Sequence, residues 1–225
     1  MTNKTNILIV EDEPLTINVL ENALKQISDT NGLIDFKIKS VTNCDLADQE
    51  LHNAVNGIPI DLLLLDISIP PSSDGKLSSG LDLGIKAKAL FPMVKIIVFT
   101  AYTNNYKLNN ILKSLNPEGF LIKSDIDFAK LIEAITTVLN DEPMYSKFVL
   151  QLMRRHLLND FVIDKIDRKL IYEISKGTKM KDITKIIPLS KSAIEYRKRN
   201  LKEKFDVQNG NDRLLISKAQ ECGFI

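Results

Sequence analysis

The sequence predicts an α/β protein, in which a doubly wound (βα)5 parallel sheet is followed by a small all-α domain. Apolar runs of strand length alternate with helix-like stretches five times over about 140 residues, as in a parallel sheet with helices on both faces. After residue 140 the strand pattern stops and only helical patterns follow. The charge divides as well, because residues 1–159 carry 15 basic and 19 acidic side chains, whereas residues 160–225 carry 15 and 10.

Four of the expected strands are short apolar runs, and the one at 36–42 is expected from its alternation of apolar and polar residues, as near a sheet edge. The clearest is "IDLLLLD" at 60–66, because a continuous apolar run of this length suits a strand that is covered on both faces. The other strands are expected at 7–10, 36–42, 95–101 and 119–123.

Helical stretches lie between and after these strands. The first has apolar residues at i, i+3, i+4 and i+7, one face of a helix, namely Leu20, Ala23, Leu24 and Ile27. Further helices are expected at 44–55, 80–91, 104–115 and from Phe128 onward. Residues 140–160 open with acids and a proline and then turn helical. Residues 163–222 read as four short helices, with Ser190 a suitable N-cap for the third.

Composition and length exclude several classes of protein. The chain has 225 residues, 44% of them hydrophobic, which suits one or two globular domains. No apolar run approaches the roughly 20 residues that a membrane-spanning helix needs, and the N-terminal stretch does not resemble a signal peptide. Cys44 and Cys222 lack metal-ligand spacing and are expected to be free thiols in a reducing compartment. We therefore expect a cytoplasmic protein without a membrane partner.

Charged and hydroxyl residues stand where the expected strands end. Asp66 ends the third strand, Glu11 and Asp12 follow the first, Thr100 ends the fourth and Lys123 ends the fifth. Because ligands of such sheets bind at the carboxyl ends of the strands, these side chains should meet. Clustered carboxylates resist ionisation without a cation, and Mg²⁺ binds through carboxylates, waters and phosphates. A lysine and a hydroxyl could hold phosphoryl oxygens, and one carboxylate could be phosphorylated.

The motifs "ILIVEDEP", "LLLLDISIP", "VFTAY" and "GFLIKSD", in this order, resemble the receiver domain of bacterial two-component response regulators over residues 5 to about 140. The resemblance implies that Asp66 accepts a phosphoryl group from a sensor histidine kinase. It implies that Glu11, Asp12, Asp66 and the backbone carbonyl of Ser68 bind Mg²⁺. It also implies that Lys123 pairs with the phosphoryl group, and that Thr100 and Phe120 move on activation.

Two features depart from the usual receiver pattern. The segment after the acceptor, "SIPPSSDGKLSSG" at 68–80, is longer by about six residues before Gly80. It borders the expected site and could alter the choice of kinase or the lifetime of the phosphoryl group. Ser124 follows the lysine, where many receivers have proline. Neither departure removes a site residue.

Residues 163–222 resemble the LuxR/NarL-type helix-turn-helix domain. The matching features include Asp167, Gly177, "KDI" with Ile183 and the stretch "PLSKSAIEYRKRNLKEKF". Asp167 stands where the family more often has glutamate, and "NGND" at 209–212 lengthens the last turn. The resemblance implies that the basic stretch is a recognition helix.

Helix geometry sorts the residues of this basic stretch. Ile194 and Leu201 share one face, which should pack on the scaffold. The roughly opposite face, suited to the major groove, carries Ser192, Glu195, Tyr196 and Arg199. Arg199 could read guanine and Glu195 could accept from cytosine, although Glu195 could instead pair with Arg199. Three flanking lysines suit phosphates: Lys191, Lys198 and Lys202. Residues 190–205 carry six basic and two acidic side chains, so DNA binding should weaken steeply with salt.

Together these patterns predict a DNA-binding response regulator. Its expected partners are a sensor histidine kinase, double-stranded DNA and a second copy, at least when phosphorylated. Its expected parts are a receiver domain at 5–140, a linker with a linking helix at 141–162 and a helix-turn-helix domain at 163–225. No site for an external substrate is visible, so we do not expect an enzyme. Three alternatives stay open: DNA binding that needs no phosphorylation, binding of a partner protein, and hydrolysis of external phosphomonoesters.

Overall fold

A computed structural model describes residues 3–32, 34–157 and 163–225. Its elements, in chain order, are β1 (Asn3–Val10), α1 (Pro14–Asn31), β2 (Ile34–Val41), α2 (Cys44–Val55), β3 (Leu62–Leu65), α3 (Gly80–Leu90), β4 (Lys95–Thr100), α4 (Asn105–Leu115), β5 (Gly119–Ile122), the 3₁₀ turn η1 (Lys123–Asp125), α5 (Phe128–Leu139), β6 (Met144–Tyr145), α6 (Lys147–Leu157), α7 (Lys165–Ser175), α8 (Met180–Ile186), α9 (Lys191–Lys204) and α10 (Asp212–Glu221). Of the linker expected at 141–162, residues 158–162 lie outside the described residues.

The described chain forms two compact units. The first contains the residues up to Tyr102 together with Ile111–Val149, and the second contains Thr103–Asn110 and Leu150–Ile225. None of the helices in the described ranges has both the length and the apolarity that crossing a bilayer requires.

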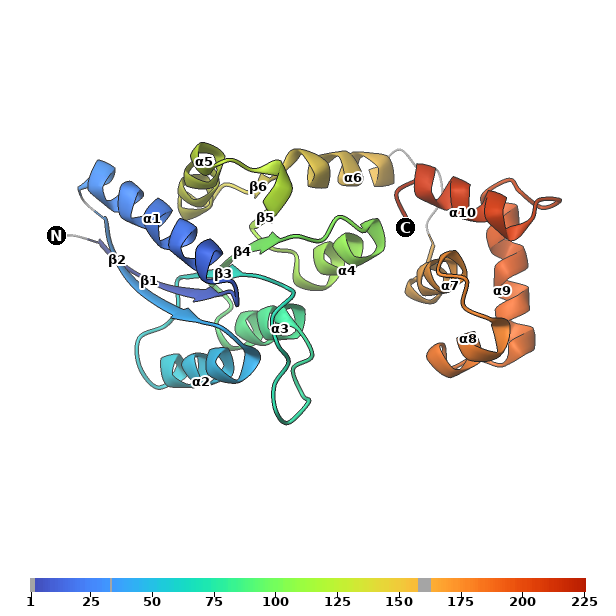
Figure 1. The fold of residues 1–225 in the computed structure, drawn as a ribbon, viewed down its shortest axis with the longest axis horizontal. Helices are drawn as coiled ribbons and strands as arrows, with labels where there is room; N and C mark the ends of the chain where they lie inside the picture. The colour runs from blue at the N-terminus through green and yellow to red at the C-terminus, as the bar shows by residue number, and fades with distance from the viewer. Residues whose placement is uncertain (1–2, 33, 158–162) are drawn as a thin grey trace. The chain divides into compact units, whose positions relative to one another are not determined.

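A parallel sheet of six strands forms the centre of the first unit, in the order β2-β1-β3-β4-β5-β6. Helices α1 and α5 cover one face, while α2, α3 and the C-terminal half of α4 cover the other (Figure 1). The four residues of β3 are buried because both faces of this central strand are covered. This architecture confirms the predicted fold class.

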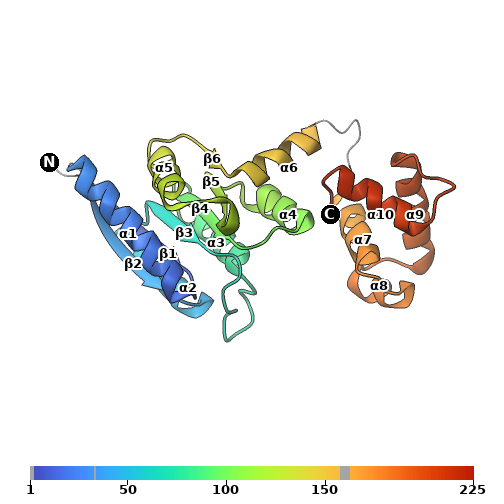
Figure 2. The same ribbon diagram turned by 45° about the horizontal axis from the view of Figure 1, so that its top comes forward.

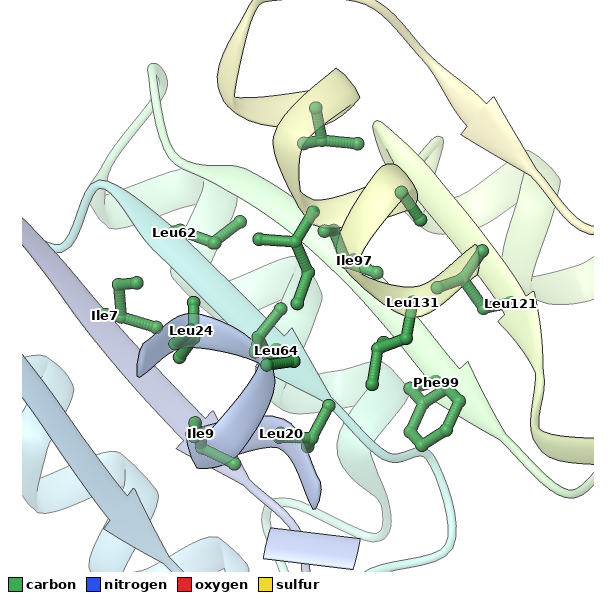
Figure 3. Packing of buried hydrophobic residues seen from close by; sticks show 14 of the residues in the cluster. Ile7, Ile9, Leu20, Leu24, Leu62, Leu64, Ile97, Phe99, Leu121 and Leu131 are labelled. Carbon is green, nitrogen blue, oxygen red and sulfur yellow. The ribbon is translucent and has the colours of Figure 1, made fainter. Parts of the chain in front are cut away.

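The hydrophobic core between the sheet and α1 and α5 follows the predicted helix periodicity. Leu20 and Leu24 of α1 pack against Ile9 and Leu64 of the sheet (Figure 3). Leu131 of α5 enters the same cluster from the neighbouring helix. Because alternate strand residues point to opposite faces, the intervening residues of β3 are buried on the other side of the sheet.

The expectation that strands end before residue 140 is wrong. Met144 and Tyr145 form β6, which pairs in parallel with Gly119 and Phe120 of β5. Two residues are too few to show an alternating pattern. Their strand conformation depends on the open edge of β5, which is a tertiary contact that the local sequence does not reveal.

Four helices, α7 to α10, form the C-terminal part of the chain from Lys165 onward (Figure 2), as expected. Helix α9 packs on α7 and α8, and α10 packs on α7. Their core includes Leu170, Ile183, Ile194, Leu201 and Leu215. Ser190 caps α9 as predicted, since its side-chain oxygen accepts from the Ala193 N–H at 3.2 Å.

Candidate functional site

The parallel register brings the strand-end residues of the first unit together. Strands β1, β3 and β5 end immediately before Glu11, Asp66 and Lys123, and β4 ends on Thr100. Glu11, Asp12 and Asp66 each offer a carboxylate oxygen, and these three oxygens lie within 4.8 Å of one another. The sequence-predicted carboxylates thus share one edge of the sheet.

The ammonium group of Lys123 lies between two buried carboxylates. Its Nζ donates a hydrogen bond to Asp66 Oδ2 at 2.8 Å and lies 2.7 Å from Glu11 Oε2. The side chains of Asp66 and Glu11 are only 5% and 2% exposed, so water does little to separate their charges. Burial alone would lower the pKa of Lys123, but the contacts with Asp66 and Glu11 outweigh it and raise the pKa above 10.5.

The surroundings of Glu11 disfavour its ionised form. Burial raises its pKa above the ordinary value of 4.5, and the charge of Asp66 raises it further, while Lys123 offsets part of the rise. Its Oε2 is buried and accepts no hydrogen bond, although its Oε1 accepts from the Glu13 N–H at 3.2 Å. The contact of Oε2 with the Lys123 ammonium at 2.7 Å compensates its burial, and a buried carboxylate oxygen held by a cationic group is also a suitable ligand for a hard cation.

Asp12 is exposed, unlike the two carboxylates beside it. The combination offers a cation one ligand from the solvent side and two from the protein side. Ser68, whose backbone carbonyl the resemblance to receiver domains implies as a further ligand, is exposed as well. The Ser68 N–H donates to Asp66 Oδ1 at 3.0 Å, which fixes the orientation of that carboxylate.

Thr100 and Phe120 occupy neighbouring strands behind the carboxylates. Both are completely buried. Thr100 Oγ1 accepts from the Tyr102 N–H at 3.3 Å, and Phe120 is paired in register with Val98 of β4. A change in either side chain must therefore be accommodated by the packed sheet.

Gly80 contacts the backbone of the Asp66 segment directly. Its N–H donates to Ile67 O at 3.1 Å. A Cβ atom at this position would lie 2.0 Å from the Asp66 carbonyl oxygen and 3.0 Å from Ile67 Cα. The sequence shows that the segment before Gly80 is longer than usual, but the close approach of Gly80 to the Asp66 backbone depends on how this loop folds.

The long loop between β3 and α3, residues 66–79, is hydrogen-bonded to the first residues of α2. Ser73 donates its N–H to both oxygens of the Asp45 carboxylate at 3.0 Å, and Pro70 O accepts from the Cys44 N–H at 3.1 Å. Within the loop, Ser72 and Leu77 exchange backbone and side-chain hydrogen bonds. These bonds were not predictable from the composition of the loop.

In the second unit, α9 presents the predicted face to solvent. Ser192, Glu195, Tyr196 and Arg199 are all exposed, whereas Ile194 and Leu201 are buried. The Arg199 guanidinium lies over the Tyr196 ring, 5.5 Å from its centroid. Glu195 lies 3.9 Å from Lys191, one turn before it.

The lysines of α9 divide into two groups. Lys191 is 70% exposed, but Lys198 and Lys202 are 23% and 19% exposed. Both of these form ion pairs with Asp212 of α10, and Lys202 also donates to Gly210 O at 2.7 Å. The positive charges expected to contact phosphates are therefore partly neutralised within the domain.

Arg197 has a structural role that the sequence did not indicate. Its guanidinium bonds to Asp164 Oδ2 at 2.6 Å and to Asp167 Oδ1 at 2.7 Å. The two acids stand three residues apart at the start of α7, where Asp164 is also the N-cap. Acidic residues are common at the N-terminus of a helix, so their spacing alone did not indicate an ion pair with α9.

No known family model matches the chain. The oxygen regulatory protein NreC of Staphylococcus epidermidis is 26% identical over 166 residues, which are 66% of this chain and 71% of that protein. The protein of the same name from Staphylococcus aureus is 24% identical over 176 residues, covering 71% and 76%.

Solved structures of RcsB resemble the chain in fold. Two RcsB dimers bound to two parallel DNAs give a TM-score of 0.62 at 20% identity, covering 97% of this chain and 99% of that chain. RcsB from Salmonella enterica serovar Typhimurium, bound to a promoter with the phosphomimetic BeF3−, gives 0.63 at 21% identity and the same coverage. The isolated REC domain of RcsB with BeF3− gives 0.52 at 22% identity, covering 66% of this chain and 98% of that domain.

The close approach of Gly80 predicts a specific cost of substitution. Gly80→Ala should lower the free energy of unfolding by about 1–3 kcal/mol, because the Asp66 backbone or the loop must move to admit a methyl group. Ser79→Ala is the matched control, since the Ser79 side chain makes no capping bond to α3. Urea denaturation of the three proteins measures the difference, and equal stability of both variants would contradict the packing described.

The raised pKa of Glu11 predicts the sign of a pH effect. A carboxyl whose pKa is raised by folding stabilises the fold while it is protonated, and this contribution is lost as pH rises through the folded-state pKa. Glu11→Gln stays neutral, so in metal-free buffer its stability relative to the unmodified chain should increase as pH rises above about 4.5. Denaturant titrations at several pH values test this, and a constant or falling difference would refute it.

Proposed function

We propose that this chain, a DNA-binding response regulator of a two-component system, is switched by phosphorylation of Asp66. The observation that carries the proposal is the position of Lys123 Nζ, 2.8 Å from Asp66 Oδ2 beside an acidic cluster. A lysine in this place can neutralise a phosphoryl group added to the carboxylate. The donor proposed from the family resemblance is a sensor histidine kinase.

In the proposed reaction Asp66 is the nucleophile. One of its carboxylate oxygens forms a bond to phosphorus while the bond between phosphorus and the donor's histidine nitrogen breaks, leaving the electron pair on nitrogen. Lys123 then moves from the carboxylate to a phosphoryl oxygen, and the Thr100 hydroxyl donates to another. Phe120, buried one strand away, would repack as Thr100 moves and so report phosphorylation to the surface.

The residues at this edge fit Mg²⁺. The proposed ligands are Glu11, Asp12, Asp66 and the backbone carbonyl of Ser68, which are oxygen ligands suited to a hard cation. The three carboxylates each offer an oxygen, and these oxygens lie within 4.8 Å of one another, which supports this assignment. When bound, Mg²⁺ supplies positive charge that neutralises the phosphoryl oxygens during transfer.

The domain assignment follows from the same proposal. Residues 5–140 would be the receiver domain, 141–162 the linker with its linking helix, and 163–225 the helix-turn-helix domain. Phosphorylation would favour a dimer in which two copies of the last domain reach adjacent half-sites. RcsB offers a parallel, since its structures include dimers bound to DNA. Because the proposed partners are a kinase and DNA, we propose that this regulator is cytoplasmic and acts on no external substrate.

Helix α9 would read DNA through its exposed face. Arg199 and Glu195 can reach base edges, with Ser192 and Tyr196 beside them. Lys191 would contact a phosphate; it is 70% exposed, and its ion pair with Glu195, at 3.9 Å, is long and open to solvent. Lys198 and Lys202 would do so only by exchanging Asp212 for DNA, because they are paired with it in the free protein.

Intact mass after incubation with a small acyl phosphate tests phosphorylation directly. We expect a Mg²⁺-dependent gain of one phosphoryl group that is absent in Asp66→Asn, since an amide is not a nucleophile for this reaction. Asp61→Asn is a matched control, because Asp61 precedes the same strand but bonds to Asn6 away from the site. A gain of mass in Asp66→Asn would contradict the assignment. No gain in any protein, together with salt-sensitive DNA binding, would instead favour regulation without phosphorylation.

Substitutions on α9 should separate base reading from phosphate contact. Arg199→Ala should weaken binding to a selected duplex by about 1–3 kcal/mol and relax its sequence preference, whereas Lys191→Ala should reduce the salt dependence by about one charge with little change in preference. Fluorescence anisotropy at several salt concentrations distinguishes the two effects. Binding that is unaffected by both substitutions would place the DNA contact on another surface.

A further inference from the structure

The turn η1 links the phosphoryl-acceptor site to the start of α6. Lys123, its first residue, extends into the site, and Asp125, its third, accepts a hydrogen bond from the Phe148 N–H at 2.8 Å. Phe148 is the second residue of α6, where backbone N–H groups have no acceptor within the helix. Asp125 therefore caps a helix to which it does not belong.

The chain just before α6 is fastened to β5 independently of this cap. Met144 and Tyr145 pair with Gly119 and Phe120. Ser146, which is buried, donates its N–H to Phe120 O at 3.0 Å and accepts from the Ile122 N–H through Oγ at 3.3 Å. The N-terminal end of α6 is thus held by hydrogen bonds of the preceding residues to β5 and by the hydrogen bond to the Asp125 side chain in η1.

These two attachments respond differently when Lys123 moves. A phosphoryl group on Asp66 extends beyond the carboxylate, so Lys123 must leave its position between Glu11 and Asp66 to follow it. If η1 shifts together with Lys123 while the paired strands β5 and β6 stay in place, the two attachments are pulled apart. The hydrogen bond from Phe148 to Asp125 is the contact between the moving turn and the fixed segment.

We propose that Asp125 is a positioning residue that couples occupancy of the Asp66 site to the cap of α6. The inference rests on the proposed function, because it needs a phosphoryl group or its mimic on Asp66. In the unphosphorylated protein the cap is formed. In the phosphorylated protein the cap opens and the first turn of α6 is released.

Thermodynamic reciprocity gives this coupling a measurable size. If the occupied state lacks the cap, then removing the cap from the free protein must favour occupancy. Asp125→Ala should therefore bind the phosphoryl mimic about fivefold more tightly, the factor expected for a helix cap. Asp125→Asn should bind it nearly as the unmodified chain does, because the asparagine oxygen is an equally good cap acceptor.

The experiment uses the full chain with Mg²⁺ and beryllofluoride. Isothermal calorimetry measures the affinity of beryllofluoride, and residue-resolved hydrogen exchange measures protection of the Phe148 amide. We expect beryllofluoride to speed Phe148 exchange in the unmodified chain and in Asp125→Asn. In Asp125→Ala that amide should already exchange fast and respond little.

A matched control comes from the neighbouring carboxylate. Asp127 caps α5, since its Oδ1 accepts from the Lys130 N–H at 2.8 Å. Asp127→Ala should lose protection at the start of α5 without changing beryllofluoride affinity or Phe148 exchange. Equal affinities of the unmodified chain and Asp125→Ala, or Phe148 exchange that beryllofluoride does not change, would overturn the coupling alone. Failure of the unmodified chain to bind beryllofluoride would overturn the coupling and the proposed function together.

Discussion

A single ammonium group, that of Lys123, permits two buried carboxylates to coexist at the end of the sheet. Glu11 and Asp66 come from strands β1 and β3, which are neighbours in the sheet, and Lys123 comes from the end of β5. A parallel sheet brings these three ends to one edge, but the same geometry places like charges together with little water to screen them. The lysine offsets this repulsion in the free protein, and we propose that a cation with a phosphoryl group does so in the phosphorylated protein.

The second unit uses ion pairs for a different purpose. Arg197 joins α9 to the start of α7 through Asp164 and Asp167, and Asp212 joins it to α10 through two lysines. These contacts fix the position of α9, whose buried face contributes only a few apolar residues to the core. The remaining charged and aromatic residues of α9 are left exposed, and they form the face that we propose reads DNA.

The sequence was sufficient to predict the first five strands of the parallel sheet and the four final helices, because their patterns are long enough to detect. It also placed Asp66 and Lys123 at strand ends, since apolar runs stop there. It could not predict β6, which forms only because β5 offers an open edge. Nor could it distinguish Lys191 from Lys198 and Lys202, because the difference depends on Asp212, an acid beyond the helix.

The most direct measurement is the Mg²⁺ affinity of Lys123→Met compared with that of the unmodified chain, at low ionic strength and neutral pH. Lys123 Nζ contacts Glu11 and Asp66, the carboxylates proposed to bind the metal, so the ammonium and Mg²⁺ compete for the same negative charge. The account predicts that Lys123→Met binds Mg²⁺ more tightly while losing its ability to gain a phosphoryl group. Weaker Mg²⁺ binding by this variant would contradict the view that the lysine and the metal compete for the same carboxylates.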